Sequence, residues 1–216
     1  MNFSVRNLVL AVLLTSGAMA AENGAFIGAS LGSMSSRNNA LLSAGPKDDP
    51  SDGVEISLNF ADSTFERALK AGYHISSLHR YYIEYATSGA VKKKLQKEEI
   101  TIEHKTSKFL LGYDFTPEII STWRGVAGVY VGILQRDTTF KADGTLESLK
   151  GKGSLVGLKL GAIYEVMKNG DIELGMKFES ANIKKNVMKD DEYILIELTK
   201  QKQNNVGFYA GYVYRF

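Results

Sequence analysis

The sequence predicts an all-β fold, in which eight antiparallel strands follow one another up and down around a closed barrel. Three observations predict it: polar and apolar residues alternate in eight segments, long and short connections alternate between these segments, and all three prolines fall in connections. Alternation gives a strand one apolar and one polar face, and proline suits connections better than paired strands. The predicted strands are 24–34, 66–76, 79–88, 103–115, 122–136, 153–167, 170–182 and 204–216.

The lengths of the connections predict which of them lie at the same end of the barrel. In an up-and-down topology, every second connection lies at one end. The long connections, near 35–65, 89–102, 137–152 and 183–203, therefore share one end, and the short connections share the other end with both termini. Barrels of the bacterial outer membrane have this asymmetry, with short periplasmic turns and longer external loops.

Residues 1–20 have the features of a secretory signal peptide. Arg6 is their only charged residue, an apolar run follows it, and the final sequence AMA fits a signal-peptidase site. The apolar run is too short to span a bilayer, which argues against a membrane anchor. We therefore expect cleavage after Ala20 and one barrel domain over residues 21–216.

The composition argues against several other classes of protein. The chain has no cysteine, so disulfides cannot contribute to its stability. Its formal net charge is only +2, which provides no strong positive field, and no nucleic-acid partner is expected. After the signal peptide, no apolar run is long enough for a membrane-spanning helix.

The polar face of the predicted strands carries charged residues, whereas the opposite face is apolar and aromatic. In strand 153–167, for example, Leu158 and Leu160 alternate with Lys159. A soluble barrel would bury such charges in an apolar core at high cost. A membrane barrel instead turns its apolar face to lipid and its charged face to the lumen, and closure leaves no unpaired edge in the hydrocarbon. The sequence therefore predicts a transmembrane β-barrel.

We expect the inward charged side chains to form salt bridges that fill the lumen, because an eight-stranded barrel is only wide enough for its own side chains. A narrow anion-selective path is the alternative, since bases outnumber acids among the inward residues. The predicted lumen charge network consists of Lys70, Arg80, Glu84, Lys108, Asp114, Arg124, Arg136, Lys159, Glu165, Glu173, Lys177, Glu179 and Arg215.

The chain ends in GFYAGYVYRF, which places Phe208, Tyr212, Tyr214 and Phe216 on one parity of the last strand. Together with the signal peptide and the eight strands, this ending resembles the small eight-stranded outer-membrane proteins of Gram-negative bacteria, the OmpX and opacity-protein type. The resemblance covers the mature chain and implies a location in the outer membrane. In that family a terminal phenylalanine, with aromatic residues at alternate positions before it, is the signal read by the outer-membrane assembly machinery. The resemblance implies this role for these four residues.

One short motif raises the question of catalysis. Some related small barrels are lipid A deacylases or acyltransferases that use histidine and serine, and His74-Ile75-Ser76 contains both. Residues two apart in a strand share a face, but their side chains lie about 6–7 Å apart. His74 is also predicted near a periplasmic turn, whereas those enzymes act on the outer leaflet. A structural histidine is the better interpretation, and no catalytic residue is predicted.

No metal or cofactor site is predicted either. His79 and His104 lack the spacing of metal ligands, and the chain has no cysteine. The segment GPKDDPSDG, residues 45–53, gathers aspartates, but a proline stands at a ligand position of the EF-hand pattern. A solvated turn explains this segment better.

Two long connections contain candidate interaction sequences. In VKKKLQKEE, residues 91–99, clustered lysines could bind lipopolysaccharide phosphates, although such a run is more often a solvated loop. The sequence EYILIEL, up to Leu198, is unusually apolar for an exposed loop. It could extend two strands as a projecting hairpin that meets a partner by strand addition, or it could pack on neighbouring loops.

These observations predict a monomeric outer-membrane barrel with a non-enzymatic surface role in structure, adhesion or interaction. The expected partners are outer-membrane lipid and lipopolysaccharide, the assembly machinery, and an external protein bound through the loops. A narrow channel or small-solute carrier is the first alternative. An enzyme that modifies outer-leaflet lipid is the second.

Overall fold

The structure is a computed structural model, and it describes the backbone of residues 24–46, 54–94, 101–142, 145–183, 186–189 and 194–216. The predicted signal peptide lies outside these residues. Among the described residues, no helix is long and apolar enough to cross a membrane. The strands are β1 (Gly24–Pro46), β2 (Val54–His74), β3 (His79–Lys94), β4 (Thr101–Phe115), β5 (Glu118–Ile120), β6 (Trp123–Ala142), β7 (Thr145–Met167), β8 (Gly170–Ile183), β9 (Asn186–Lys189) and β10 (Ile194–Arg215).

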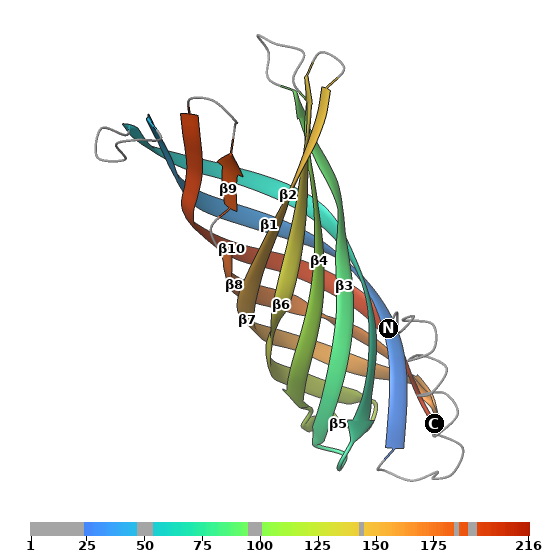
Figure 1. Cartoon of the computed structure of the whole chain (residues 1–216). Coiled ribbons are helices and arrows are strands. Elements are labelled where there is room, and N and C mark those ends of the chain that lie inside the picture. The colour runs from blue at the N-terminus through green and yellow to red at the C-terminus, as the bar shows by residue number, and fades with distance from the viewer. Residues whose placement is uncertain (1–23, 47–53, 95–100, 143–144, 184–185, 190–193) are drawn as a thin grey trace, which may run out of the picture.

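Eight long strands form a closed antiparallel barrel, which confirms the predicted fold class (Figure 1). Each long strand pairs with the next one in the chain, and β1 pairs with β10 to close the barrel. At the seam Ile27 lies opposite Tyr214, and the backbone N–H of Phe216 donates to the carbonyl of Ala25 at 3.0 Å. The short strand β5 pairs with β6, and the short strand β9 pairs with β10.

The strands extend further than the sequence pattern predicts. The segments near 35–65, 89–102, 137–152 and 183–203, predicted as long loops, are largely continuations of strands. The physical reason is that alternation of polar and apolar residues marks a strand only where one of its faces meets lipid. Farther out, both faces can be polar, yet the backbone still pairs with its neighbours.

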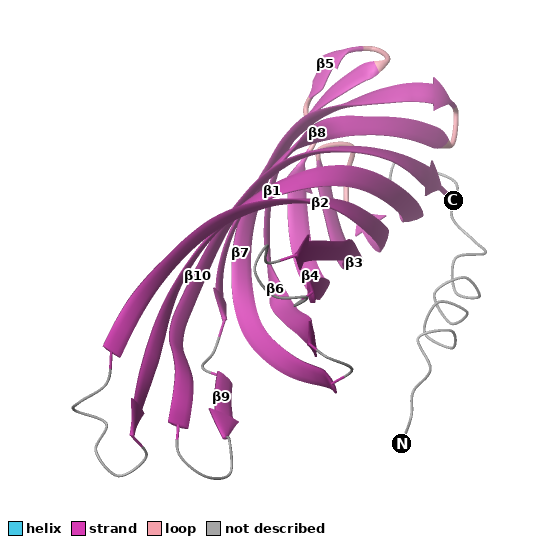
Figure 2. Cartoon of the chain, turned by 90° about the horizontal axis from the view of Figure 1, so that it is seen from above, coloured by secondary structure: helices cyan, strands magenta, loops and turns pink. Residues whose placement is uncertain are grey.

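Above the barrel the strands diverge into two groups (Figures 1 and 2). One group contains β1, β2, β9 and β10, and the other contains β3, β4, β6 and β7. The divergence begins where β2 and β3 separate, because their pairing ends at Glu66 and Ser88. Beyond that point β2 pairs with β1 over residues 54–65, and β3 pairs with β4.

The barrel has an apolar exterior and a charged interior, as the alternation predicts. Leu158 and Phe208 point outward and are 55% and 64% exposed, whereas Lys159 and Glu173 are 1% and 0% exposed. An aqueous barrel would expose these apolar side chains to water at a large cost in free energy. The arrangement is therefore stable only with lipid around it.

Inside the barrel, aromatic rings lie over glycines on neighbouring strands. Each ring stands directly opposite its glycine, and a Cβ atom at the glycine would collide with the ring. A Cβ at Gly72, for instance, would lie 2.6 Å from Cζ of Phe26. The missing side chain on one strand thus makes room for the large one on the next. The pairs are Phe26 over Gly72, Tyr82 over Gly112, Tyr130 over Gly157 and Tyr209 over Gly175.

We predict that Gly112→Ala lowers the free energy of unfolding by about 1–3 kcal/mol, because the added methyl group overlaps the ring of Tyr82, which is buried and cannot move into solvent. Urea unfolding in lipid vesicles, followed by the fluorescence of Trp123, measures the change. Gly89→Ala is the matched control, since the nearest atom to its Cβ is 3.7 Å away. Equal stabilities of the two variants would contradict the packing argument.

Candidate functional site

The lower half of the lumen is organised around Glu173, which β8 contributes to the interior. Its carboxylate is 2.7 Å from Nζ of Lys70, 2.6 Å from Nη2 of Arg80 and 3.4 Å from Nζ of Lys159. The hydroxyl of Tyr209 donates a further hydrogen bond to it at 2.8 Å. Side chains from β2, β3, β7 and β10 thus converge on one carboxylate.

Asp114 is the second acid of this lower network. Its Oδ2 atom accepts hydrogen bonds from Arg80 and from Lys159, each at 2.7 Å. The lower network therefore contains three bases, Lys70, Arg80 and Lys159, and two acids. Its members are almost completely buried. Removing such charges from water is costly, and only their mutual pairing offsets that cost.

An upper network lies farther from the tight turns and has the opposite balance. Lys108 donates to Glu66 at 2.7 Å and to Glu179 at 2.6 Å, while Lys177 pairs with Glu84. This network has two bases and three acids. The hydroxyl of Tyr130 and the amide of Asn205 also donate to Glu179, at 3.2 and 2.9 Å. Taken together, the lower and upper networks hold five bases and five acids.

The ends of the lumen carry smaller clusters. At the end with the tight turns, Asp171 accepts from Arg124 at 2.7 Å and from Arg215 at 3.2 Å, and Arg215 also lies 3.3 Å from Glu165. These groups are partly exposed, apart from Asp171. At the other end, Arg136 donates to the side-chain carbonyl of Gln203. The structure thus brings all thirteen residues of the predicted lumen network into the interior of the barrel or its mouths.

Three inward acids were missing from the prediction. Asp62 and Glu66 share the parity of Lys70 on β2, and Asp171 shares the parity of Glu173 on β8, so alternation alone could have identified all three. With these three residues, eight acids face eight bases. The predicted excess of bases, on which the anion-selective path depended, therefore disappears.

Apolar side chains also occupy the lumen, which the alternation did not predict. A buried cluster on β4, β6, β7 and β8 fills the space beside the upper network. A smaller cluster contains Phe26, Tyr82 and Val213. Side chains of this size, together with the ion pairs, fill an eight-stranded barrel. The first cluster consists of Leu110, Tyr130, Leu134, Leu155, Ala181 and Ile183.

The histidine and serine that suggested catalysis do not act on one another in this arrangement. The buried ring of His74 packs against Phe26, with ring centroids 5.0 Å apart, and its Nε2 atom has no hydrogen-bond partner among the described residues. The hydroxyl of Ser76 instead accepts from the backbone N–H of Leu78 at 3.2 Å. A nucleophile needs its base within hydrogen-bond distance. This pair therefore supports no nucleophilic chemistry.

The described residues contain no cluster of histidine, aspartate and glutamate that could hold a metal ion. Nδ1 of His79 forms a hydrogen bond with the hydroxyl of Tyr113 at 2.6 Å. The aspartates of residues 47–53 lie outside the described part of the chain, as do residues 95–99 of the lysine run 91–99. The first three lysines of that run, residues 92–94, lie on β3, but their side chains and that of His104 are outside the described set.

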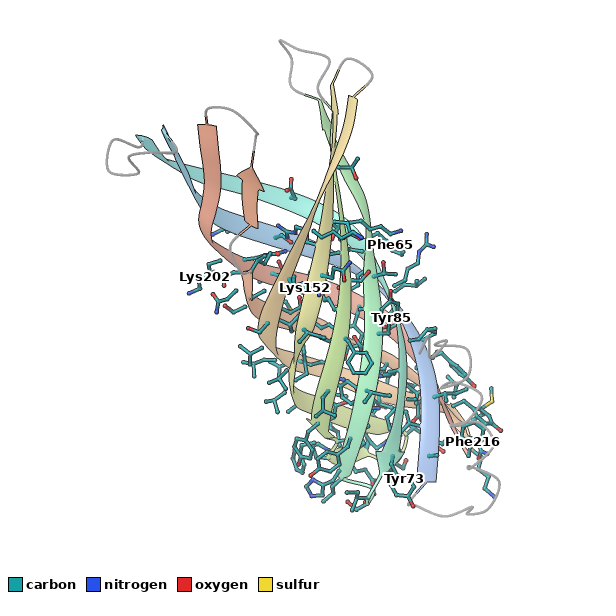
Figure 3. All side chains as sticks on the ribbon, in the orientation of Figure 1. Phe65, Tyr73, Tyr85, Lys152, Lys202 and Phe216 are labelled. Carbon is teal, nitrogen blue, oxygen red and sulfur yellow. The ribbon has the colours of Figure 1, made fainter. Side chains whose placement is uncertain are left out.

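Aromatic side chains gather at the end of the barrel with the tight turns. Figure 3 shows Tyr73 and Phe216 at this end. Trp123 packs against Tyr164 at 4.9 Å, and Tyr214 against Phe216 at 5.3 Å, measured between ring centroids. Aromatic rings at this level form the girdle that membrane barrels place at the interface between lipid and water. The role of Phe208, Tyr212, Tyr214 and Phe216 in assembly stays a prediction.

We predict that Glu173→Gln lowers the free energy of unfolding by about 3–5 kcal/mol, because Lys70 would lose its ion-pair partner among the described residues, and Arg80 and Lys159 would share Asp114 alone. Denaturant unfolding in lipid vesicles measures the loss. Glu165→Gln, which removes the same charge from a partly exposed pair with Arg215, is expected to cost about 1 kcal/mol or less. A similarly small cost for both variants would show that the lower network does not hold the barrel together.

Comparisons with known proteins agree with this fold. No protein-family model matches the chain, and no curated protein matches its sequence. Among solved structures, Ail of Yersinia pestis in complex with the heparin analogue sucrose octasulfate is 17% identical, with a TM-score of 0.50 over 88% of this chain and 99% of that one. The Neisserial surface protein NspA is 14% identical, with a TM-score of 0.48 over 89% and 99%. The outer-membrane protease OmpT of Escherichia coli is 8% identical, with a TM-score of 0.48 over 93% and 100%.

At sequence identities this low, a structural likeness shows the fold alone and says nothing about the activity. A β-sheet protein that spans a lipid bilayer must close its barrel and turn apolar side chains to the lipid, and this barrel does both while pairing its charges inside. The chain is an integral outer-membrane protein with the fold of the small eight-stranded barrels, a fold that Ail also has.

Proposed function

We propose that the chain is a non-enzymatic, monomeric surface protein that binds an external partner through the strands projecting beyond its barrel. One observation carries this proposal: the strands continue well past the apolar exterior, while the lumen below them is filled. β1 and β2, for example, stay paired as far as Ala44 and Val54. A filled barrel offers no obvious path for a solute, whereas the projecting strands offer a surface outside the membrane.

The two networks make the barrel a rigid support for these strands. Paired charges in a low-dielectric interior resist separation, because each separated charge would be left buried without a partner. Glu173 alone ties together side chains from four other strands. The points at which the projecting strands leave the barrel are therefore held at fixed positions relative to one another.

The projecting strands also present free backbone edges. Over residues 54–61, β2 pairs with β1 on one side, and no other described strand pairs with it on the side away from β1. Likewise, residues 91–94 of β3 pair only with β4 among the described strands. An unpaired edge exposes backbone N–H and C=O groups that can accept a further strand. Strand addition to such an edge is a general mode of peptide recognition.

The predicted hairpin around EYILIEL contributes to the same projection. The backbone of residues 194–198 continues β10 and pairs with β1 on one side and with β9 on the other. The side chains of this segment lie outside the described set. Its backbone nevertheless supports the interpretation of this segment as a projecting hairpin over that of an irregular loop.

The channel alternative has a direct test in planar bilayers. Because buried ion pairs and apolar side chains fill the lumen, we expect the reconstituted protein to give no stepwise conductance above that of the bare lipid. The matched positive control is a barrel with a known open lumen, inserted under the same conditions. Reproducible conductance steps from this chain would favour a narrow channel over a surface-binding role.

The proposed function predicts binding of extended peptides at the edge of β2. A shortened variant replaces residues 40–58 with Asn-Gly, which joins Asn39 to Asn59, two residues that pair across the hairpin. The control replaces residues 138–149 with Asn-Gly in the same way. From a displayed library of random peptides, we expect the full chain and the control to select binders that the shortened variant does not bind.

Hydrogen exchange identifies the mode of binding in the same experiment. Strand addition is expected to slow exchange at alternate backbone amides of residues 54–61, because every second N–H points toward the free edge. Heat-modifiable migration in electrophoresis checks that both shortened chains still fold. Peptides that bind the shortened variant as well as the full chain, or none that bind at all, would contradict the proposal.

A further inference from the structure

The apolar exterior of the barrel ends abruptly on four neighbouring strands. Among the described side chains of β1, β7, β8 and β10, the last large apolar ones that point outward are Leu31, Val156, Phe178 and Val206, and all of them are exposed. The next outward positions on these strands are polar. This level therefore marks the boundary between the hydrocarbon and the headgroups on the external side of the membrane.

A group of bases lies just beyond this boundary, and we name it the outer basic patch. It consists of Arg37 on β1, Lys150 and Lys152 on β7, and Lys202 on β10, with the exposed amides of Asn182 on β8 and Asn204 on β10 between them. Figure 3 shows Lys202 projecting from the barrel, away from the end that carries Tyr73 and Phe216.

The pairing register shows that these residues form one continuous surface. Asn204 lies opposite Arg37 on one side and opposite Ser180 on the other. Lys202 lies opposite Asn182. Asn182 in turn lies opposite Ser154, the outward residue next to Lys152. The patch thus crosses four adjacent strands, about 14 Å at the usual strand spacing.

The bases of the patch have no ion-pair partners among the described side chains. The outward residue Asp137 on β6 stands opposite Lys150 at the margin of the patch, and it accepts a hydrogen bond from Gln135 at 3.2 Å. Lys105 of β4 stands on the other side of Asp137, so this one acid separates the patch from the next outward base. At this level no acid stands at a described outward position of β1, β7, β8 or β10, so the positive charge of the patch has no counter-charge on its own strands.

From this placement we infer that the outer basic patch binds the phosphate groups of an anionic lipid in the external leaflet. Lysine and arginine side chains and amide N–H groups are suitable donors to phosphate oxygens. The acyl chains of such a lipid would lie against Val156, Phe178 and Val206 directly below. A soluble polyanion would use the bases but gain nothing from this apolar surface. The inference rests on the membrane orientation of the barrel and is independent of the proposed function.

The test uses the full mature chain in mixed micelles of phosphatidylcholine and bisphosphorylated lipid A. The double variant Lys152→Gln/Lys202→Gln removes two positive charges from the patch. Lys105→Gln/Lys168→Gln is the matched control, because it removes the same charge from exposed positions outside the patch. Native mass spectrometry counts the bound lipid A, and the rise in melting temperature with lipid A concentration reports its affinity.

We expect the patch variant to bind lipid A about 10- to 30-fold more weakly, since each base near an anionic headgroup contributes about a few-fold in affinity. The control variant and the variant Lys152→Arg/Lys202→Arg should bind like the natural chain. Dephosphorylated lipid A should bind weakly to all of them. Equal binding by the patch and control variants, or equal binding of the dephosphorylated lipid, would overturn the inference.

Two further experiments test whether the patch binds free phosphate or a sulfated polysaccharide in place of lipid. Inorganic phosphate at the same concentration as the lipid should not displace it, and displacement would show a site for free phosphate. Heparin tests a sulfated polysaccharide as the alternative partner. If heparin binding depends on Lys152 and Lys202 while lipid A binding does not, the patch serves the polysaccharide, and the inference about lipid is wrong.

Discussion

The charged side chains that the strands turn away from lipid must find their counter-charges inside the barrel. This constraint governs the rest of the structure. Eight strands enclose a lumen too narrow for bulk water, so each buried base or acid is stable only beside an opposite charge. Glu173 meets this constraint for three bases at once. The apolar exterior, the closed seam between β1 and β10, and the filled lumen follow from the same arrangement.

The balance between the two networks has a structural consequence. The lower network has one more base than acid, and the upper network has one more acid than base, so the two together are neutral. The networks lie at different heights, and β2, β3, β4 and β8 contribute charged side chains to both of them. Ion pairing therefore holds the barrel together at two levels. The aromatic rings that lie over glycines fill the space between the pairs, and they add contacts that do not depend on charge.

The faces of the strands could be predicted from the sequence, because lipid on one side and charge on the other impose strict alternation. Leu158 and Lys159 lie where their parity places them. The partners across the lumen could not be predicted in this way. Lys70 and Glu173 are 103 residues apart, and their contact depends on the stagger of the strands around the barrel, which no local pattern encodes. Apart from the hairpin around EYILIEL, the projecting strands were also missed, since segments such as Ser35–Asn39 are polar on both faces and lack a period of two.

The quenching of a single tryptophan in lipid vesicles tests the inside-out arrangement most directly. The chain has one tryptophan, so the variant Trp123→Phe/Leu160→Trp carries one reporter on the middle of the exposed face of β7. We predict strong quenching by phospholipids brominated near the centre of their acyl chains, and weak quenching by aqueous acrylamide. Strong quenching by acrylamide with none by the brominated lipids would place Leu160 away from the hydrocarbon and contradict the account.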